Sequence, residues 1–272
     1  MIGIMQGRLV EPVEGRIQAF PREQWAVEFP NAAAAGLEAI EWIYDTYGLG
    51  ANPLENPQGI SRINQLSRNH GVAVRSVCAD YFMDFAFVRA SEADRALRLD
   101  KLVWLLGEAR QIGVTRIVLP FVDQSAICNE ADRDAVVEVL QRVLPVARSL
   151  TIELHLETGL APDDFAALLA RVPDPFVKVN YDSGNSSSLG YRPSEELAAY
   201  GRRLGSVHIK DRVRGAGTVP LGQGDANFDE LFTGLRSLNY QGDFILQVAR
   251  ATASDEVAWA RHNVAFIKRY WN

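Results

Sequence analysis

The stretch TIELHLETG at residues 151–159 is followed by VKVNYDSGN at 177–185, SVHIKD at 206–211 and FILQVAR at 244–250. Each stretch contains a short, largely apolar run that leads into polar residues, and segments with helical spacing separate the stretches. Such apolar runs are typical of parallel strands that are buried on both faces. The four stretches therefore predict consecutive strands of a parallel sheet wrapped in helices.

The same pattern extends over the whole chain and predicts eight strands, at residues 2–6, 38–42, 73–78, 116–120, 151–157, 177–181, 206–210 and 244–247. Eight strand-helix units suit a (β/α)₈ barrel, which has about 250 residues, and the chain has 272. An open nucleotide-binding sheet is the alternative, but Gly7-Arg8-Leu9 after the first strand lacks the G-x-G-x-x-G pattern. Because no linker interrupts the sequence, we expect residues 1–272 to form a single α/β domain, a TIM barrel.

Capping signals predict several helix boundaries. Ser91 can cap a helix that extends to residue 112 and stops at Gly113, and Asn227 can open another. Pro30 falls inside the helical pattern of residues 22–35, where it would remove a backbone donor. We therefore expect the first helix to be kinked or split.

Composition excludes several classes of function. The net charge of -6 argues against nucleic-acid or anionic-membrane surfaces, which need clustered Lys and Arg. No apolar run approaches the roughly 18 residues of a spanning helix, and the N-terminus lacks a signal peptide, so a cytoplasmic protein is expected. Cys78 and Cys128 show no metal or redox spacing, and we expect both to pack in the core.

Polar residues gather at the carboxyl ends of the last four predicted strands, where barrel enzymes carry their catalytic groups. Glu157, Asp182, His208 and Gln247 occupy consecutive strands there. Two carboxylates, an imidazole and an amide oxygen suit one divalent metal ion, Mn²⁺, Mg²⁺, Co²⁺ or Zn²⁺. Singly, these residues are more often turn residues or satisfied core groups, but burying several of them without partners costs several kcal/mol. Their convergence favours a metal site.

The stretch SVHIKDRVRGAGTVPLGQGDANF at residues 206–228 resembles a His-x-x-Asp/Glu loop followed by a Leu-Gly-x-Gly turn. These features are similar to those of the sugar phosphate isomerase/epimerase group of the xylose-isomerase-like TIM barrel superfamily, and the resemblance covers nearly the whole chain. It implies that Glu157, Asp182, His208 and Gln247 are the metal ligands and that the substrate is a small sugar or sugar phosphate.

Two positions depart from the pattern that the resemblance implies. The fourth ligand is usually Glu where this chain has Gln247, and a substrate-binding His is often found where it has Asn185. In the epimerases of the group, two carboxylates exchange a proton from opposite faces of the substrate, and a carboxamide cannot act as a base. We therefore expect Glu157 to be the single base, acting through a metal-bound enediolate in an isomerisation, and we expect 3-epimerisation by paired carboxylates to be disfavoured.

Further residues at the predicted mouth are candidates for substrate contact. Lys210 shares the inward parity of His208 and is a catalytic candidate that polarises a substrate oxygen, or else it neutralises Asp182. The substrate-binding candidates are Gln6, Arg8, Glu41, Asp80, Asn185, Asp211 and Arg214, with Arg212 and Arg250 as weaker ones. His155 and Glu153 share the parity of Glu157 and should fill deeper barrel layers.

Other functions are compatible with the same residues. A keto-polyol dehydratase of the inosose type would use the same metal and base but expel a hydroxyl group. A barrel that binds a polyol without turning it over is a second alternative, and a multi-metal DNA-repair endonuclease is disfavoured by the presence of only four histidines. A homodimer is compatible with the sequence, which contains no decisive interface signal.

Overall fold

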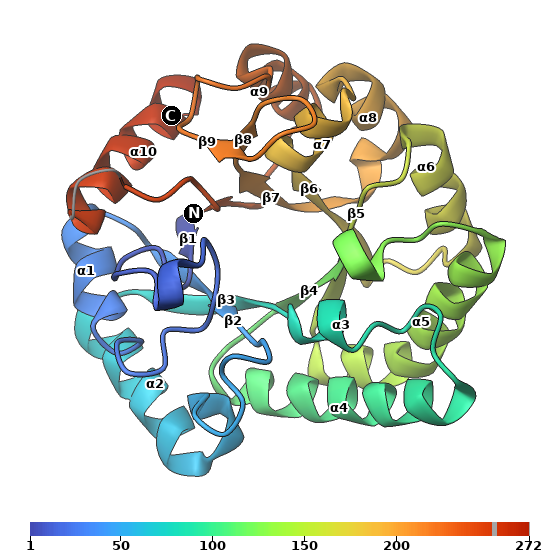
Figure 1. Cartoon of the computed structure of the whole chain (residues 1–272), viewed down its shortest axis with the longest axis horizontal. Coiled ribbons are helices and arrows are strands. Elements are labelled where there is room, and N and C mark those ends of the chain that lie inside the picture. The colour runs from blue at the N-terminus through green and yellow to red at the C-terminus, as the bar shows by residue number, and fades with distance from the viewer. Residues whose placement is uncertain (252–254, 272) are drawn as a thin grey trace.

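Eight parallel strands close into a barrel in the computed structural model, which describes residues 1–251 and 255–271 (Figure 1). Around the barrel the strand order is β1-β10-β7-β6-β5-β4-β3-β2. The strands are β1 (Ile2–Met5), β2 (Ala39–Ile43), β3 (Ala73–Cys78), β4 (Arg116–Phe121), β5 (Glu153–Thr158), β6 (Val177–Asp182), β7 (Leu204–Ile209) and β10 (Asp243–Leu246). All eight coincide with the predicted segments to within a few residues, so the prediction of a TIM barrel is confirmed.

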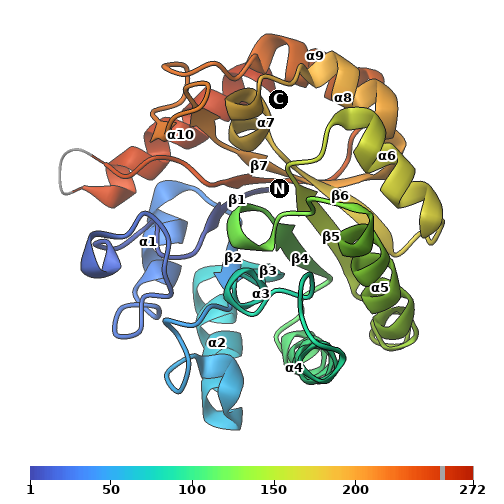
Figure 2. The same cartoon turned by 45° about the vertical axis from the view of Figure 1, so that its right-hand side comes forward.

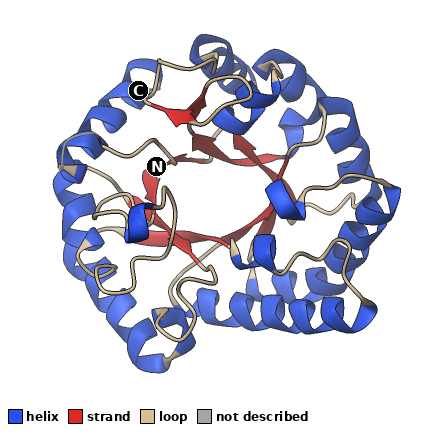
Figure 3. Ribbon diagram, viewed as in Figure 1, coloured by secondary structure: helices blue, strands red, loops and turns tan. Residues whose placement is uncertain are grey.

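Helices form a ring around the strands (Figure 3), and Figure 2 shows the ring turned by 45°. The α-helices are α1 (Glu28–Ala35), α2 (Pro57–His70), α3 (Tyr81–Asp84), α4 (Glu92–Gln111), α5 (Glu130–Leu150), α6 (Pro162–Arg171), α7 (Ser183–Leu189), α8 (Pro193–Tyr200), α9 (Phe228–Ser237) and α10 (Glu256–Tyr270). Short 3₁₀ turns are η1 (Val13–Gly15), η2 (Pro53–Glu55), η3 (Asp123–Ser125) and η4 (Gly201–Arg203). After β7, a hairpin of β8 (Asp211–Arg212) and β9 (Thr218–Val219) lies with α3 and α7 inside the helical ring, over the barrel mouth (Figure 1).

Helix caps follow most of the predicted signals. The Ser91 hydroxyl accepts the N–H of Asp94 at 3.1 Å to open α4, and Gly113 follows that helix at a φ of 87°. The Asn227 side chain caps α9 in the same way. The first helix differs, because residues 22–27 form turns and α1 begins only at Glu28. Pro30 therefore lies in the first turn of α1, where its missing N–H is not needed, so the expected kink is absent and the predicted segment is instead split into turns at residues 22–27 and the helix from Glu28.

The apolar core fills the space between barrel and helices, since every residue of β2 and β4 is buried. Cys78 belongs to this core, as predicted, whereas Cys128 is exposed and the prediction for it is wrong. Cys128 lies between η3 and α5, where its backbone N–H donates to Asp132 at 2.9 Å. None of the described helices has the length and apolarity to cross a membrane.

Candidate functional site

A pocket of about 580 Å³ opens at the carboxyl ends of the barrel strands. Its wall includes six of the predicted site residues: Arg8, Asp80, Glu157, Asn185, Lys210 and Gln247. They come from segments that are far apart in the sequence, and closure of the barrel brings them together. This end of the barrel is where TIM-barrel enzymes carry their active sites.

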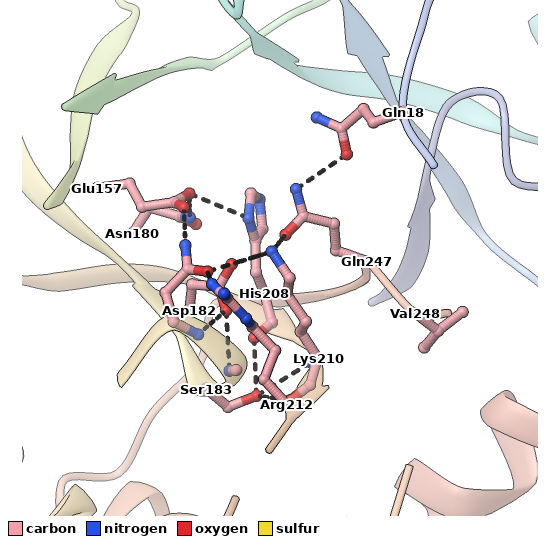
Figure 4. A network of polar contacts seen from close by, with 12 residues as sticks. Gln18, Glu157, Asn180, Asp182, Ser183, His208, Lys210, Arg212, Gln247 and Val248 are labelled. Atoms are coloured by element: carbon pink, nitrogen blue, oxygen red, sulfur yellow. Dashed lines mark hydrogen bonds and ion pairs between the residues drawn. The ribbon is translucent and has the colours of Figure 1, made fainter. Parts of the chain in front are cut away.

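Three of the four predicted ligands form a compact cluster at the base of the mouth (Figure 4). Glu157 ends β5, Asp182 ends β6 and His208 lies in β7, and one ligand atom from each lies within 4.8 Å of the others. All three side chains are buried. Asp182 serves two purposes, because Oδ1 accepts the N–H groups of Gly184 and Asn185 at the start of α7 while Oδ2 points into the site.

Both oxygens of Glu157 are oriented by side-chain amides. Asn180 donates to Oε2 at 2.9 Å and Asn185 donates to Oε1 at 2.7 Å. Asn180 is held in turn by Ser206, whose hydroxyl donates to Asn180 Oδ1 at 2.6 Å and contacts His155 Nδ1 at 2.7 Å. His155 therefore lies in a deeper layer, as predicted from its parity, and supports Glu157 through a buried polar chain.

His208 is positioned from behind by Glu41, which was predicted to contact substrate. Its Nε2 lies 2.6 Å from Glu41 Oε1, and both side chains are fully buried. Its Nδ1 lies 3.2 Å from Glu157 Oε2, but it forms no hydrogen bond with any described residue. Burial alone would lower the pKa of His208, but the charges of Glu41 and Glu157 outweigh it and raise this pKa to about 10. Glu41 does not line the pocket and acts through His208.

Lys210 and Gln247 complete the mouth (Figure 4). Each follows the last residue of its strand, β7 or β10. The ammonium of Lys210 lies 3.2 Å from Gln247 Oε1, 3.2 Å from Asn185 Oδ1 and 3.4 Å from Asp182 Oδ2. The amide oxygen of Gln247 therefore faces the carboxylate cluster, and the positive charge of Lys210 is placed beside Asp182, consistent with either of the two roles predicted for it.

Three other predicted substrate contacts lie elsewhere. Gln6 is buried below the mouth, where its Oε1 accepts the N–H of Ile43 at 2.9 Å. Asp211 is buried and accepts backbone N–H groups of residues 222, 224 and 226, so it shapes the loop after β7. Arg214 packs over Gly190 and lines a separate pocket of about 300 Å³. None of the three lines the main pocket, and these expectations are revised accordingly.

Two residues that the sequence pattern ranked low or did not mark line the pocket and bond to other site residues. Arg212, predicted only as a weaker candidate, lines the pocket and donates from Nη1 to Asn185 Oδ1 at 3.0 Å. The β8–β9 hairpin pairs Arg212 with Thr218 and so directs it inward. Gln18, which no motif marked, lines the pocket and accepts the amide N–H of Gln247 at 3.0 Å. Its contact spans 229 residues of sequence, and only the folded chain reveals it.

The donor set fits one divalent cation. His208 Nδ1 is a buried nitrogen without a hydrogen bond among the described residues, and it faces the oxygens of Glu157 and Asp182. The Glu41-His208 pair has the arrangement in which a metal-bound imidazole donates its other ring N–H to a carboxylate. Mixed carboxylate and imidazole ligands suit the ions expected from the sequence.

The closed barrel and the polar cluster at its mouth define a class of TIM-barrel protein with a carboxylate-rich site. A family model, the xylose isomerase-like TIM barrel, matches residues 29–270, and the chain belongs to this family. The L-ribulose-5-phosphate 3-epimerase UlaE of Shigella flexneri is 25% identical over 247 residues, which span 87% of this chain and 86% of the relative.

Solved structures with the same fold cover nearly the whole chain. The D-allulose 3-epimerase of Methylomonas sp. in complex with D-allulose superposes with a TM-score of 0.77 at 17% identity, covering 99% of this chain and 96% of that one. The IOLI protein with a bound zinc atom gives a TM-score of 0.79 at 15% identity, with 100% and 99% covered. At these identities the likeness establishes the fold alone.

Proposed function

We propose that this protein is a divalent-metal-dependent isomerase of a small sugar or sugar phosphate, with Glu157 as the base. The observation that carries the proposal is the convergence of Glu157, Asp182 and His208 at one edge of an open pocket. Sugar epimerases among the relatives, such as the ribulose-phosphate enzyme of Shigella flexneri, support an isomerase or epimerase activity.

Glu157, Asp182, His208 and the amide oxygen of Gln247 would hold the ion. When bound there, a divalent ion would supply the Lewis acidity that makes a proton on the carbon beside a carbonyl group easier to remove. Glu157 lines the pocket with both oxygens oriented by Asn180 and Asn185, so it can take that hydrogen from carbon and return it to the neighbouring carbon on the same face. Lys210 places a positive charge beside the oxygens on which negative charge develops.

Gln247 favours isomerisation over epimerisation. Inversion of a carbon centre requires proton delivery to the opposite face, and an amide on β10 cannot take or give that proton under ordinary conditions. Lys210 donates to Gln247 Oε1 and Gln18 accepts from Gln247 Nε2, so the amide is held with its oxygen toward the carboxylate cluster, where a second lone pair of that oxygen can face an ion. Its role in the proposal is to coordinate the ion.

The test begins with metal analysis of the purified protein, followed by a screen of aldoses, ketoses and their phosphates in D₂O. Isomerisation with deuterium uptake at a single carbon is the expected result. A product lighter by one water would instead identify the dehydratase, and metal binding without any exchange would identify a binding protein. Efficient inversion at C3 that disappears in a Gln247→Ala variant with its metal retained would contradict the role given to Gln247.

A further inference from the structure

A chain of hydrogen bonds crosses the pocket from β7 to the end of β3. Lys210 Nζ lies 3.2 Å from Gln247 Oε1, and Gln247 Nε2 donates to Gln18 Oε1 at 3.0 Å, as Figure 4 shows. Gln18 Nε2 donates in turn to Asp80 Oδ2 at 2.6 Å. All four residues line the pocket, so the chain lies where a substrate would bind.

The direction of this chain follows from its charged members. Lys210 has no acceptor, so Gln247 must present its oxygen to Lys210 and its N–H to Gln18. Arg8 also has no acceptor, and its Nη2 lies 3.2 Å from the same oxygen of Gln18. Gln18 therefore turns its N–H group toward Asp80, and the Asp80 carboxylate accepts the hydrogen bond. The chain joins a cation on one wall of the pocket to a carboxylate on another.

We propose that Asp80 is the second proton-transfer group of this site, the group that moves the hydroxyl proton of the substrate between its two oxygens. The proposal rests on the proposed isomerase function. Asp80 follows β3 and lines the same pocket as Glu157. Gln18 fixes Oδ2, and the Cys78 thiol contacts Oδ1 at 3.1 Å, so the carboxyl group is oriented from two sides.

The surroundings of Asp80 suit a group that exchanges protons near neutral pH. Burial is the main cause that raises the pKa of Asp80, to about 6, and the negative charges of Asp45 and Glu157 act in the same direction. The hydrogen bonds from Gln18 and Cys78 oppose this shift. Arg8 is the cation that faces Asp80 from the β1 side. A carboxyl group with a pKa of this size can accept and release a proton readily at the working pH.

In the proposed step the substrate is a ketose with a hydroxyl-bearing carbon next to its carbonyl group. Glu157 takes a proton from that carbon, and the electron pair forms a carbon-carbon double bond as the carbonyl oxygen becomes an enolate oxygen. The Asp80 carboxylate takes the proton of the neighbouring hydroxyl and gives it to the enolate oxygen. The second oxygen then forms the new carbonyl group, and Glu157 returns its proton to the former carbonyl carbon.

The amide at position 247 and the carboxyl at position 80 depend on each other. A glutamate at 247 would point an oxygen at the Gln18 oxygen, and rotation of the Gln18 amide would then point an oxygen at Asp80. Because the two carboxylates would lie at opposite ends of the Gln18 amide, its NH₂ group can face only one of them at a time. In this chain Gln18 accepts from the amide of Gln247 and donates to the carboxylate of Asp80.

The first test compares Asp80→Asn with the control Asp163→Asn, whose carboxylate is exposed in the first turn of α6. General acid-base groups contribute about 10²- to 10⁴-fold, so Asp80→Asn should lower kcat by about 10²-fold or more with KM within about threefold. The wild type should lose activity as the pH falls through about 6, and this acidic limb should be absent in Asp80→Asn. A decrease below threefold with the limb retained would overturn the proposal while leaving the isomerase function standing.

A double variant keeps the test decisive if Asp80→Asn alone disturbs the pocket. Gln247→Glu should be strongly impaired because two carboxylates then compete for the NH₂ group of Gln18. The double variant Asp80→Asn/Gln247→Glu again has a single carboxylate, now at position 247, for Gln18 to bind. The double variant should be at least tenfold more active than the product of the single effects predicts. Simple additivity would overturn the proposal. If the metal-loaded wild type exchanged no deuterium with any sugar, the proposed function itself would fail, and this inference with it.

Discussion

The two ends of the barrel interior both carry buried charges, but they arrange them differently. At the amino-terminal end, Arg116 Nη1 donates to Asp243 Oδ2 at 2.6 Å, and the chain's amino group lies 3.2 Å from Asp243 Oδ1. At the carboxyl end, Glu41, Glu157 and Asp182 surround His208, with Lys210 as the nearby cation. Carboxylates therefore find permanent cations at one end and are in excess at the other.

This difference separates groups that stabilise the barrel from groups to which we assign the proposed chemistry. Asp243 is matched by Arg116, and although burial would raise its pKa, the guanidinium outweighs this and lowers it. The three carboxylates around His208 exceed the charge of Lys210 by two, and a divalent ion on a neutral His208 would balance that excess. The amino-terminal end thus has its own counter-charges, whereas the cluster around His208 would be completed by the proposed cation.

The largest effect is expected from Glu157→Gln at the mouth. Loss of the base should lower sugar-dependent deuterium exchange by about 10²- to 10⁴-fold, because an amide of the same shape cannot take the proton. Glu196→Gln is the matched control, since Glu196 is a buried glutamate bonded to Tyr181, Ser186 and Tyr200 outside the pocket. Exchange per folded molecule should stay within about threefold in the control. Equal losses in both variants would remove the distinction between the two glutamates.

The next effect is expected at the opposite end, from Arg116→Met. Removing the guanidinium leaves Asp243 buried beside fewer cations, and breaking a buried pair in this way costs about 3–5 kcal/mol. Urea unfolding should show this loss in the free energy of unfolding, while kcat/KM per folded molecule stays within about threefold. A loss of catalysis larger than the loss of folded protein would mean that this end also serves the chemistry.

Metal binding should stabilise the protein through the mouth alone. At a metal concentration about 100 times Kd, the free energy of unfolding should rise by about 2.7 kcal/mol. Asp182→Asn should lose this increase because it removes one ligand, whereas Arg116→Met should keep it despite its lower baseline. Unfolding curves with Mn²⁺ and after chelation provide the measurement. An increase of the same size in Asp182→Asn would place the ion elsewhere.

The strands and the ligand cluster were predictable because both follow from local pattern. Apolar runs marked the eight strands, and strand-end polar residues such as Glu157 and Asp182 projected to the same mouth. Glu41 was predicted to contact substrate at the mouth, but it lies in the middle of β2 and is placed behind His208. Depth along a strand is set by barrel register, which the sequence pattern does not reveal.

Residues in the loops were harder to predict. Arg214 was favoured over Arg212 by the resemblance to the sugar isomerase group, but the β8–β9 hairpin reverses the chain after β7 and turns Arg212 inward. Gln18 lies in the long β1–α1 connection, which has no periodicity, and its partners are Gln247 and Asp80. The single domain, the cytoplasmic location and the homodimer stay predictions, since they depend on properties other than the arrangement of one chain.

The smallest effect, and the one that contrasts the two ends most directly, is the pH dependence of stability. In the metal-free protein the pKa of His208 is raised to about 10, against about 6.5 in the unfolded chain. The folded state therefore keeps a proton that the unfolded state releases, and stability should fall as the pH rises above about 6.5, by at most about 1.4 kcal/mol per pH unit. Asp243 has a lowered pKa, so its contribution is present above about pH 3.9 and is lost as the pH falls.

Urea unfolding between about pH 2 and pH 8.5, with and without Mn²⁺, separates the two ends. Saturating metal should flatten or reverse the decline between pH 6.5 and 8.5, because the ion takes the place of the proton on His208 Nδ1 and binds more tightly as protons become scarce. His208→Asn should remove the metal-free decline, and Asp243→Asn should change only the acidic side of the profile. If the metal-free protein kept constant stability from pH 6.5 to 8.5, His208 would not hold a proton between Glu41 and Glu157, and the charge imbalance assigned to the mouth would have to be smaller.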